Sequence, residues 1–555
     1  MELTPQQPPR APGPEDSFDT DRPAPAALPP VPASLAEPPP PSMRTTLRRA
    51  AFGMVAGAVL VTGAVVAVPD EDKEAAPVSG PVSRAMSATA AGSPASLPDL
   101  TALIGDRRKW VGAHPSDAPA WAVLGSAYVE WGRRAADPAY YTRAEQALKR
   151  SLNVRPGEKG NTAAWVGLAS LANARHDFVT AKKWGETVRA RQPKEWTVYP
   201  ELIDAYNGLG DRKSAITAVE RFTELRAGVP ALGRAAEMYR DRGRPEDALA
   251  TAREAAHRAR TPAEKAACLA RLGELAWERG EPEEAVARYG AALRAEKGHH
   301  PSLAGRARAL AALGRTDEAV RDYQAALAKS PLPVYLLELG ELYESMGLDG
   351  DSTNQYEKLR AALDRGRAGG VDESLLLGRF EAAHGDADAA VELLRGTWER
   401  GHRSAAVADA LGWALHRSGD SGAALEYAQR AVDSGGRNAS YAYHLGMVRR
   451  AVNDYGAARR HLEEALRTNP AFSPLDAPLA QEALDTLAQP PAVVRPAPQA
   501  PAPQVPAPQQ PPAPAGDPAP APAAGPQGQQ AVPAPSAPAP QAPVQPSAAP
   551  SAAVR

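Results

Sequence analysis

Few residues of this chain are spaced as an active site requires. Residues 208–214, GLGDRKS, are similar to a phosphate-binding loop, but Arg212 replaces its last glycine and no strand precedes it. Asp349 and Asp351 could begin a calcium loop, yet Asn354 stands where such a loop needs glycine. We therefore expect a turn between two helices at the first segment and a polar turn at the second.

The remaining reactive side chains are isolated in the sequence. The segment YESMG around Ser345 lacks the first glycine of a hydrolase nucleophile elbow. His299 and His300 have no further metal ligands at regular spacing, so we expect a surface loop there. The single cysteine, Cys268, excludes a disulfide framework and a Cys-clustered zinc site, and we expect it to pack inside a helix. The sequence thus predicts no catalytic residues, no metal and no cofactor.

Composition favours an all-α core between two disordered ends. Many of the 57 prolines lie in residues 5–41 and 490–550, and such Pro-rich segments cannot bury a core. Between them Ala, Leu, Arg and Glu dominate, and these side chains lose little freedom in a helix. The net charge is −2 with both signs mixed along the chain, so we expect no nucleic-acid partner.

Residues 50–68 form an uncharged run of 19 residues, which is long enough to cross a bilayer as a helix. Arg44, Arg48 and Arg49 precede this run, and mainly acidic residues follow it. By the positive-inside rule we expect a cytoplasmic N-terminus and an extracytoplasmic remainder, held by a single-pass anchor.

A cleaved signal peptide with a peptidase site near Ala67 is the alternative reading of this run. The long N-terminal extension and the length of the run favour an uncleaved anchor. Gly53 and Gly57 form a small-xxx-small pair, so weak self-association through the anchor is a further hypothesis.

One pattern recurs about every 34 residues in the centre of the chain, and it is clearest in residues 439–470. There Leu445, Gly446, Ala458, Leu462 and Pro470 stand at repeat positions 7, 8, 20, 24 and 32. This segment resembles the tetratricopeptide repeat. The resemblance implies a right-handed superhelical solenoid of about ten helix-turn-helix repeats, each with a helix A and a helix B.

Small residues at position 8 are expected where helices A and B of one repeat approach closely. That position is occupied by Gly125, Ala169, Ile203, Ala236, Gly273, Ala307, Gly340, Gly378, Gly412 and Gly446. Ile203 is therefore the poorest fit to the pattern.

Turn residues recur between the two helices of each repeat. Asp211, Asp386 and Asp420 are placed to cap the N-terminus of helix B. We expect a left-handed glycine just before helix B at Gly132, Gly210, Gly243, Gly280, Gly314, Gly347, Gly385 and Gly419.

Four irregular segments depart from this register. Residues 133–140 contain an insertion, which we expect to form an extended loop, and the Gly-rich residues 365–370 suggest a flexible joint after repeat 7. Leu100, Leu103, Ile104 and Trp110 are spaced as one face of an N-terminal helix, and residues 475–488 can form a last amphipathic helix.

Five segments result from this reading. They are a cytoplasmic Pro-rich tail at 1–43, a membrane anchor at 44–69, a linker at 70–96, a repeat solenoid with capping helices at 97–488, and a Pro/Ala/Gln-rich tail at 489–555.

The resemblance also implies where a partner binds, because A helices line the concave face of such solenoids. In the last three repeats the register places there Arg379, Asp409, Trp413, His416, Tyr443, Met447 and Arg450. The middle repeats contribute an acidic stretch, which would favour a basic partner: Glu237, Glu274, Trp277, Glu278, Glu341 and Glu344. Alternatively, Trp277 and Trp413 only pack between repeats. Position 9 never contains the Asn of the family's carboxylate clamp.

The function predicted is a non-enzymatic scaffold that binds other proteins or peptides on the outer face of a membrane. One alternative is a cell-envelope spacer that acts through its Pro-rich tails, and another is a repeat protein secreted after cleavage. A regulatory subunit or an unrecognised hydrolase is the alternative from the enzyme class.

Overall fold

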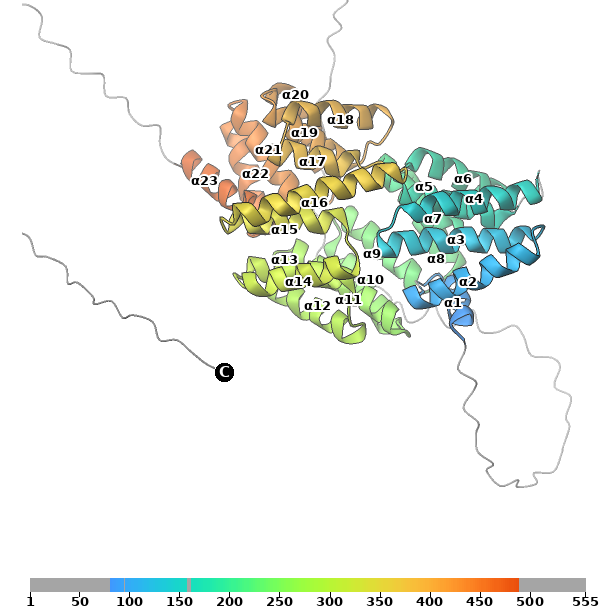
Figure 1. Cartoon of the computed structure of the whole chain (residues 1–555). Coiled ribbons are helices and arrows are strands. Elements are labelled where there is room, and N and C mark those ends of the chain that lie inside the picture. The colour runs from blue at the N-terminus through green and yellow to red at the C-terminus, as the bar shows by residue number, and fades with distance from the viewer. Residues whose placement is uncertain (1–79, 94, 157–160, 489–555) are drawn as a thin grey trace, which may run out of the picture. The chain divides into compact units, whose positions relative to one another are not determined.

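The computed structural model describes residues 80–93, 95–156 and 161–488. These residues contain 23 helices and no strand, which confirms the predicted all-α class. The helices follow one another as antiparallel neighbours along the chain (Figure 1).

Ten helix pairs form the ten expected repeats, each with helix A before helix B. From repeat 1 to repeat 10 they are α3 Ala118–Ala135 and α4 Ala139–Val154; α5 Thr162–Ala174 and α6 Phe178–Arg191; α7 Val198–Leu209 and α8 Arg212–Leu225; α9 Val229–Asp241 and α10 Pro245–Arg258; α11 Pro262–Glu278 and α12 Pro282–Ala295; α13 His300–Ala312 and α14 Thr316–Lys329; α15 Pro333–Ser345 and α16 Asp349–Ala368; α17 Ser374–His384 and α18 Ala387–Glu399; α19 Ala405–Arg417 and α20 Ser421–Val432; α21 Ala439–Ala451 and α22 Tyr455–Thr468.

Three helices flank the repeats. The expected C-terminal helix is α23, Asp476–Ala488, and the expected N-terminal helix is α2, Leu97–Ala113. A further helix, α1 (Pro81–Ala91), lies in the range that composition assigned to a linker. Leu100, Leu103 and Ile104 of α2 are buried as predicted, but Trp110 is 45% exposed. Its indole instead donates to the Asp117 carboxylate at 2.8 Å, across the turn that follows α2.

Position 8 is where helices A and B touch, as the small residues there predicted. A Cβ on Gly273 would lie 2.7 Å from the ring of Tyr289, which stands at position 24 of the same repeat. The same close approach to the position-24 residue holds for Gly125, Gly340, Gly378, Gly412 and Gly446. In repeat 3, Ile203 at position 8 is buried in one cluster with Val219 at position 24. Val219 is smaller than Tyr289, which stands at position 24 of repeat 5. Close packing of the two helices therefore depends on the summed size of the residues at positions 8 and 24.

Most of the predicted turn chemistry is confirmed. The carboxylates of Asp211, Asp386 and Asp420 accept hydrogen bonds from backbone N–H groups in the first turn of α8, α18 and α20. A positive φ is found at Gly210, Gly243, Gly280, Gly314, Gly347 and Gly419. The prediction was wrong at Gly132, which lies inside α3 against Tyr141, and at Gly385, whose φ is −142°.

Two further expectations about irregular segments were wrong. The insertion at 133–140 forms no extended loop, because α3 continues to Ala135 and α4 begins at Ala139. Asp349 and Asp351 belong to the first turn of α16 instead of a polar turn, where their charges favour the helix N-terminus.

The Gly-rich residues 365–370 end a 20-residue helix, α16, and are anchored to repeat 2. Arg175 donates to the main-chain oxygen of Gly369 at 3.2 Å, and the N–H of Asp372 donates to the main-chain oxygen of Arg175 at 2.9 Å. The segment expected to be a flexible joint is therefore hydrogen-bonded to repeat 2, through residues 194 positions apart in the sequence.

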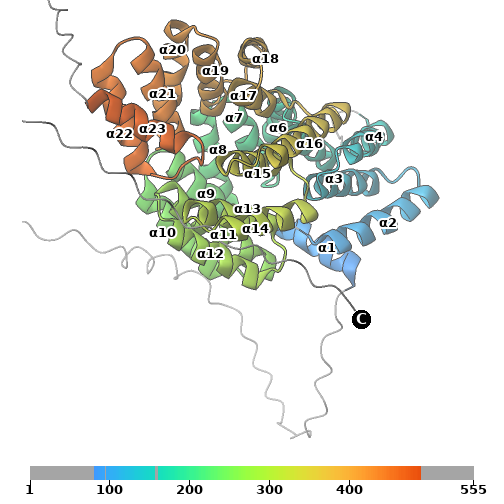
Figure 2. The ribbon, with the colours of Figure 1, turned by 60° about the vertical axis from the view of Figure 1, so that its left-hand side comes forward.

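The solenoid curls far enough for its later repeats to return to its earlier ones (Figures 1 and 2). The A-to-B turn of repeat 3 lies against the linker after repeat 8, where a Cβ on Gly210 would strike the backbone of Arg403. The turn of repeat 4 meets the linker after repeat 9, at Gly243 and Gly435. The side chain of Asn469 donates to the main-chain oxygen of Trp277, 192 residues earlier, at 2.9 Å. We call this line of contacts the seam.

No described helix combines the length and apolar character needed to cross a bilayer. The predicted anchor at residues 50–68, with Gly53 and Gly57, lies outside the described residues, as do both Pro-rich tails.

Candidate functional site

The curled repeats enclose a cavity of about 1,090 Å³, which we call the central groove. Its walls come mainly from the A helices of repeats 5 to 10, together with the segment that links α22 to α23. This arrangement agrees with the expectation that A helices line the concave face. Because the chain curls, Trp277 of repeat 5 and Trp413 of repeat 9 line the same cavity.

Six of the predicted binding residues line the central groove. They are Trp277, Glu341, Glu344, Arg379, Asp409 and Trp413. Sequence reasoning had placed the first three in the middle repeats and the other three in the last repeats of the same concave face. The curl of the repeats brings the two sets together.

The two tryptophans mainly pack, as the alternative interpretation held. Each is only 8% exposed. The ring of Trp413 stacks on His444 with centroids 4.2 Å apart, and His444 in turn holds the Asp409 carboxylate at 2.9 Å. Asp409 is buried and already has this partner, so its role in the groove is to position His444.

The accessible polar side chains of the groove include several that sequence reasoning did not select. Arg379 and Arg417 are exposed, whereas Glu341 and Tyr441 are half-buried. His384 approaches Glu341 at 3.5 Å and Glu344 at 3.2 Å. The groove thus presents aromatic edges, two exposed arginines and a carboxylate pair that is bridged by a histidine.

The other seven predicted residues lie outside the groove lining: His416, Tyr443, Met447, Arg450, Glu237, Glu274 and Glu278. Tyr443 is 1% exposed and packs on Trp413 and Phe472, so it belongs to the core. His416 contacts the Ser421 hydroxyl at 2.9 Å, and burial lowers the pKa of its imidazole to about 4.

Met447 packs against the C-terminal apolar cluster, and Arg450 is half-buried near the end of α21. Glu274 lies 3.4 Å from Arg308. None of these three side chains is placed to meet a ligand in the groove.

Arginines pair with three carboxylates of the middle acidic stretch, those of Glu237, Glu274 and Glu278, whereas Glu341 and Glu344 have His384 beside them. Glu237 pairs with Arg234 and Arg271, and Glu278 with Arg240 at 3.5 Å. Burial opposes ionisation of Glu237, but Arg271 and Arg234 outweigh it and hold its pKa below the ordinary value.

Arg308 joins three repeats in this ladder of ion pairs. Its guanidinium lies 3.4 Å from Glu274 of repeat 5 and 3.0 Å from Glu338 of repeat 7. Both Arg308 and Glu274 stand at position 9 of their repeats. Position 9 thus holds opposite charges in neighbouring repeats, and this alternation was a signal in the sequence for the ion pair.

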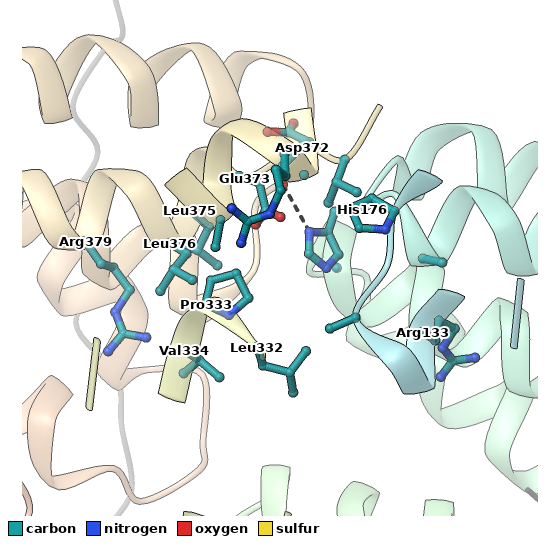
Figure 3. A pocket seen from close by; sticks show the side chains of 18 of the residues that line it. Arg133, His176, Leu332, Pro333, Val334, Asp372, Glu373, Leu375, Leu376 and Arg379 are labelled. Atoms are coloured by element: carbon teal, nitrogen blue, oxygen red, sulfur yellow. Dashed lines mark hydrogen bonds between the residues drawn. The ribbon is translucent and has the colours of Figure 1, made fainter. Parts of the chain in front are cut away.

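A second cavity of about 420 Å³, the junction pocket, lies where repeats 1 to 3 meet repeats 6 to 9 (Figure 3). In this view Arg133 and Arg379 lie on opposite walls, and Leu332, Pro333 and Val334 lie between them. His176 reaches toward the chain at Asp372 and contacts its main-chain oxygen at 3.0 Å. Arg379 lines both the junction pocket and the central groove. Sequence reasoning could not find this pocket, because its walls are brought together by the seam.

The isolated reactive side chains have structural partners. His300 is the first residue of α13 and His299 is its N-cap residue; His299 contacts Ser302 at 2.8 Å and His300 contacts the Tyr335 hydroxyl at 2.9 Å. Both are half-buried, so the expected surface loop was wrong. Within residues 80–93, 95–156 and 161–488, no three His, Cys, Asp or Glu side chains are grouped to hold a metal ion.

Cys268 is buried in α11 as expected, and burial raises the pKa of its thiol to about 11. The similarity of residues 208–214 to a phosphate loop is explained by the turn between α7 and α8.

Comparisons with known proteins agree with this architecture. Models of the tetratricopeptide repeat match residues 270–345 and 410–474, and a second such model matches residues 229–254. A search of curated protein sequences returns no match.

The solved structures that are similar to this chain include the following two. The complex "APC/C hetero-tetramer Cut9-Hcn1" is 14% identical, with 74% of this chain and 86% of that chain covered and a TM-score of 0.38. A tetratricopeptide repeat protein from Parabacteroides merdae is 18% identical, with 47% and 99% covered and a TM-score of 0.29.

The repeat matches and the ten helix pairs lead to one conclusion: this chain contains tetratricopeptide repeats.

Proposed function

We propose that this chain is a non-enzymatic scaffold whose central groove binds a polypeptide segment of a partner protein. The observation that carries the proposal is the groove itself, in which A helices of six repeats converge on one cavity. Arg417 and Tyr441 offer a charged and an aromatic contact there, the residue types that dominate binding energy at protein interfaces.

An extended peptide with both a carboxylate and an apolar side chain fits this lining best. Arg417 is exposed and lies 5.9 Å from the ring centre of Trp413, so a carboxylate on the guanidinium would lie beside an aromatic edge. The carboxylates of Glu237, Glu274 and Glu278 are paired with arginines, so a purely basic peptide gains little from these three.

The test is affinity capture with the full chain and two groove variants, Arg417→Glu and Tyr441→Ala. Each variant should lose the captured partners at least tenfold, because interface arginine and tyrosine contacts contribute on the order of 2 kcal/mol. Arg253→Glu, a reversal at an exposed arginine of α10, is the matched control and should retain them. Partners that survive both groove variants but disappear on deletion of residues 489–555 would show that the tail binds instead.

We also propose that residues 50–68 anchor the chain and place the repeats on the extracytoplasmic face. The uncharged run and the preceding arginines support this orientation. Cys268 gives a low labelling background, because its buried thiol has a raised pKa and forms little thiolate at neutral pH.

Two introduced cysteines, each in a chain that retains Cys268, test the orientation with a membrane-impermeant maleimide. Ser345→Cys, at an exposed position of α15, should react in intact cells after wall removal, whereas Ser34→Cys should react only after lysis. The reverse labelling pattern would overturn the orientation, and release of the Ser345→Cys chain into the medium would indicate cleavage.

A further inference from the structure

The junction pocket is a second cavity, which shares only Arg379 with the lining of the central groove. Its volume of about 420 Å³ falls within the range of small-molecule sites, roughly 300–1,000 Å³. Separate chain segments surround it: the A-to-B turns of repeats 1 and 2, the start and end of repeat 7, and the starts of repeats 8 and 9. A pocket of this size suits a compact ligand better than a continuous polypeptide.

Apolar side chains form most of the pocket wall. Phe178 enters from repeat 2, Leu332 and Val334 from the start of repeat 7, and Leu376 and Val407 from repeats 8 and 9. Transfer of an aliphatic chain from water to such a wall is favourable by about 0.8 kcal/mol for each CH₂ buried.

One edge of the pocket offers positive charge without an internal partner. Arg379 and Arg365 are exposed, and within the described part of the chain neither side chain has an ion pair or hydrogen bond. The nearby carboxylate of Asp372 is engaged by Arg400 at 3.0 Å. Glu373 also faces the pocket. Burial raises the pKa of its carboxyl group, so a smaller fraction is ionised and it attracts the two arginines less strongly.

We propose that the junction pocket binds a small amphiphile, an aliphatic chain that ends in one carboxylate. The chain occupies the space between Leu332, Val334 and Leu376, and the carboxylate meets the guanidinium of Arg379. Because the walls belong to both sides of the seam, the bound molecule holds repeats 1 to 3 against repeats 7 to 9. Since Arg379 also lines the central groove, occupation of the pocket removes one cation from the partner-binding surface.

Decanoate is the probe, and the full chain is titrated with it below its micellar concentration by calorimetry. We expect saturable binding with one site per chain. Arg379→Gln should weaken decanoate about tenfold or more, because a charged hydrogen-bonded pair is lost. Decan-1-ol, which has the same chain but no charge, should bind the unmodified protein and Arg379→Gln equally. Arg253→Gln is the matched control and should bind decanoate as the unmodified protein does.

A second readout separates a seam site from adsorption elsewhere. Decanoate should slow amide exchange in residues 139–141 and in residues 371–376 together, and Leu376→Trp, which fills the pocket, should abolish both effects. If Leu376→Trp fails to fold, the Arg379→Gln comparison still decides the matter.

Three outcomes would overturn the proposal. They are no saturable binding of decanoate, equal affinity for the unmodified protein and Arg379→Gln, and exchange protection confined to one side of the seam. If the unmodified protein does not bind decanoate and Leu376→Trp loses partner capture, a partner side chain occupies the pocket instead. That result would leave the scaffold function intact, whereas failure of the Arg417→Glu and Tyr441→Ala tests would not affect the decanoate result.

Discussion

The side-chain amide of Asn469 donates a hydrogen bond to the main-chain oxygen of Trp277, at 2.9 Å, although 192 residues separate them. Asn469 is 3% exposed, so this bond forms away from water. It fastens the linker after repeat 10 to the last turn of helix A in repeat 5. The two ends of the central groove are held together by this contact.

Asn469→Ala should therefore loosen the seam. It leaves the Trp277 carbonyl oxygen with one fewer partner in a buried position, which costs on the order of 1–3 kcal/mol. We expect a lower denaturation midpoint and faster amide exchange at the ends of α11 and α22. Asn207→Ala, at an exposed position of α7, is the control and should change neither. Unchanged exchange at α11 in Asn469→Ala would show that the contact contributes nothing to closure.

Gly273→Ala should destabilise the protein even though alanine favours helices. The added Cβ would lie 2.7 Å from the Tyr289 ring, and overpacking of this kind costs about 1–3 kcal/mol. Gly290→Ala, in helix B of the same repeat, meets no atom closer than 3.7 Å, so it should stabilise by up to about 1 kcal/mol. Urea denaturation of the two variants should give opposite signs, and a gain in both would refute close packing at position 8.

Arg308→Leu should destabilise more than loss of a surface ion pair does. Arg308 is 28% exposed and contacts Glu338 at 3.0 Å, so its removal leaves a carboxylate without compensation, at a cost of about 2–3 kcal/mol. Arg258→Leu, which breaks the exposed pair with Glu254, should cost less than about 1 kcal/mol. Glu338→Gln added to Arg308→Leu should restore part of the loss.

The stability of Arg308→Leu should depend on pH through the carboxyl group of Glu338. Burial already raises the pKa of Glu338 above its ordinary value, and Arg308 opposes that rise. Without Arg308 the folded state binds a proton at Glu338 more tightly than the unfolded state does. The stability of Arg308→Leu should then increase as pH falls from 7 toward the ordinary carboxyl range near 4.5. A variant that lost stability over this range, relative to the unmodified protein, would contradict the assignment.

His300 should make the folded protein sensitive to acid. Burial, with the charge of Arg134, lowers the pKa of its imidazole from 6.5 to about 4. The unfolded state therefore binds a proton that the folded state does not, so stability is lost as pH falls from 6.5 to 4, by at most about 1.4 kcal/mol per pH unit. His300→Gln should flatten this slope in denaturation curves measured between those values. His257→Gln, at an exposed histidine, should leave the slope unchanged.

The sequence by itself determined the features that depend on neighbours within one repeat. The ten helix pairs, the Asp caps of helix B and the small residue at position 8 were all predicted, because each depends on contacts within about 34 residues. The errors at Gly132 and in residues 133–140 arose where an insertion could lengthen two helices as easily as form a loop.

Only the tertiary structure decided how repeats far apart in the chain meet. Small rotations between successive repeats add up along a solenoid, so their sum, and not any local pattern, brings Asn469 to Trp277 and Arg175 to Gly369. The same sum places Trp277 and Trp413 in one groove and creates the junction pocket around Arg379.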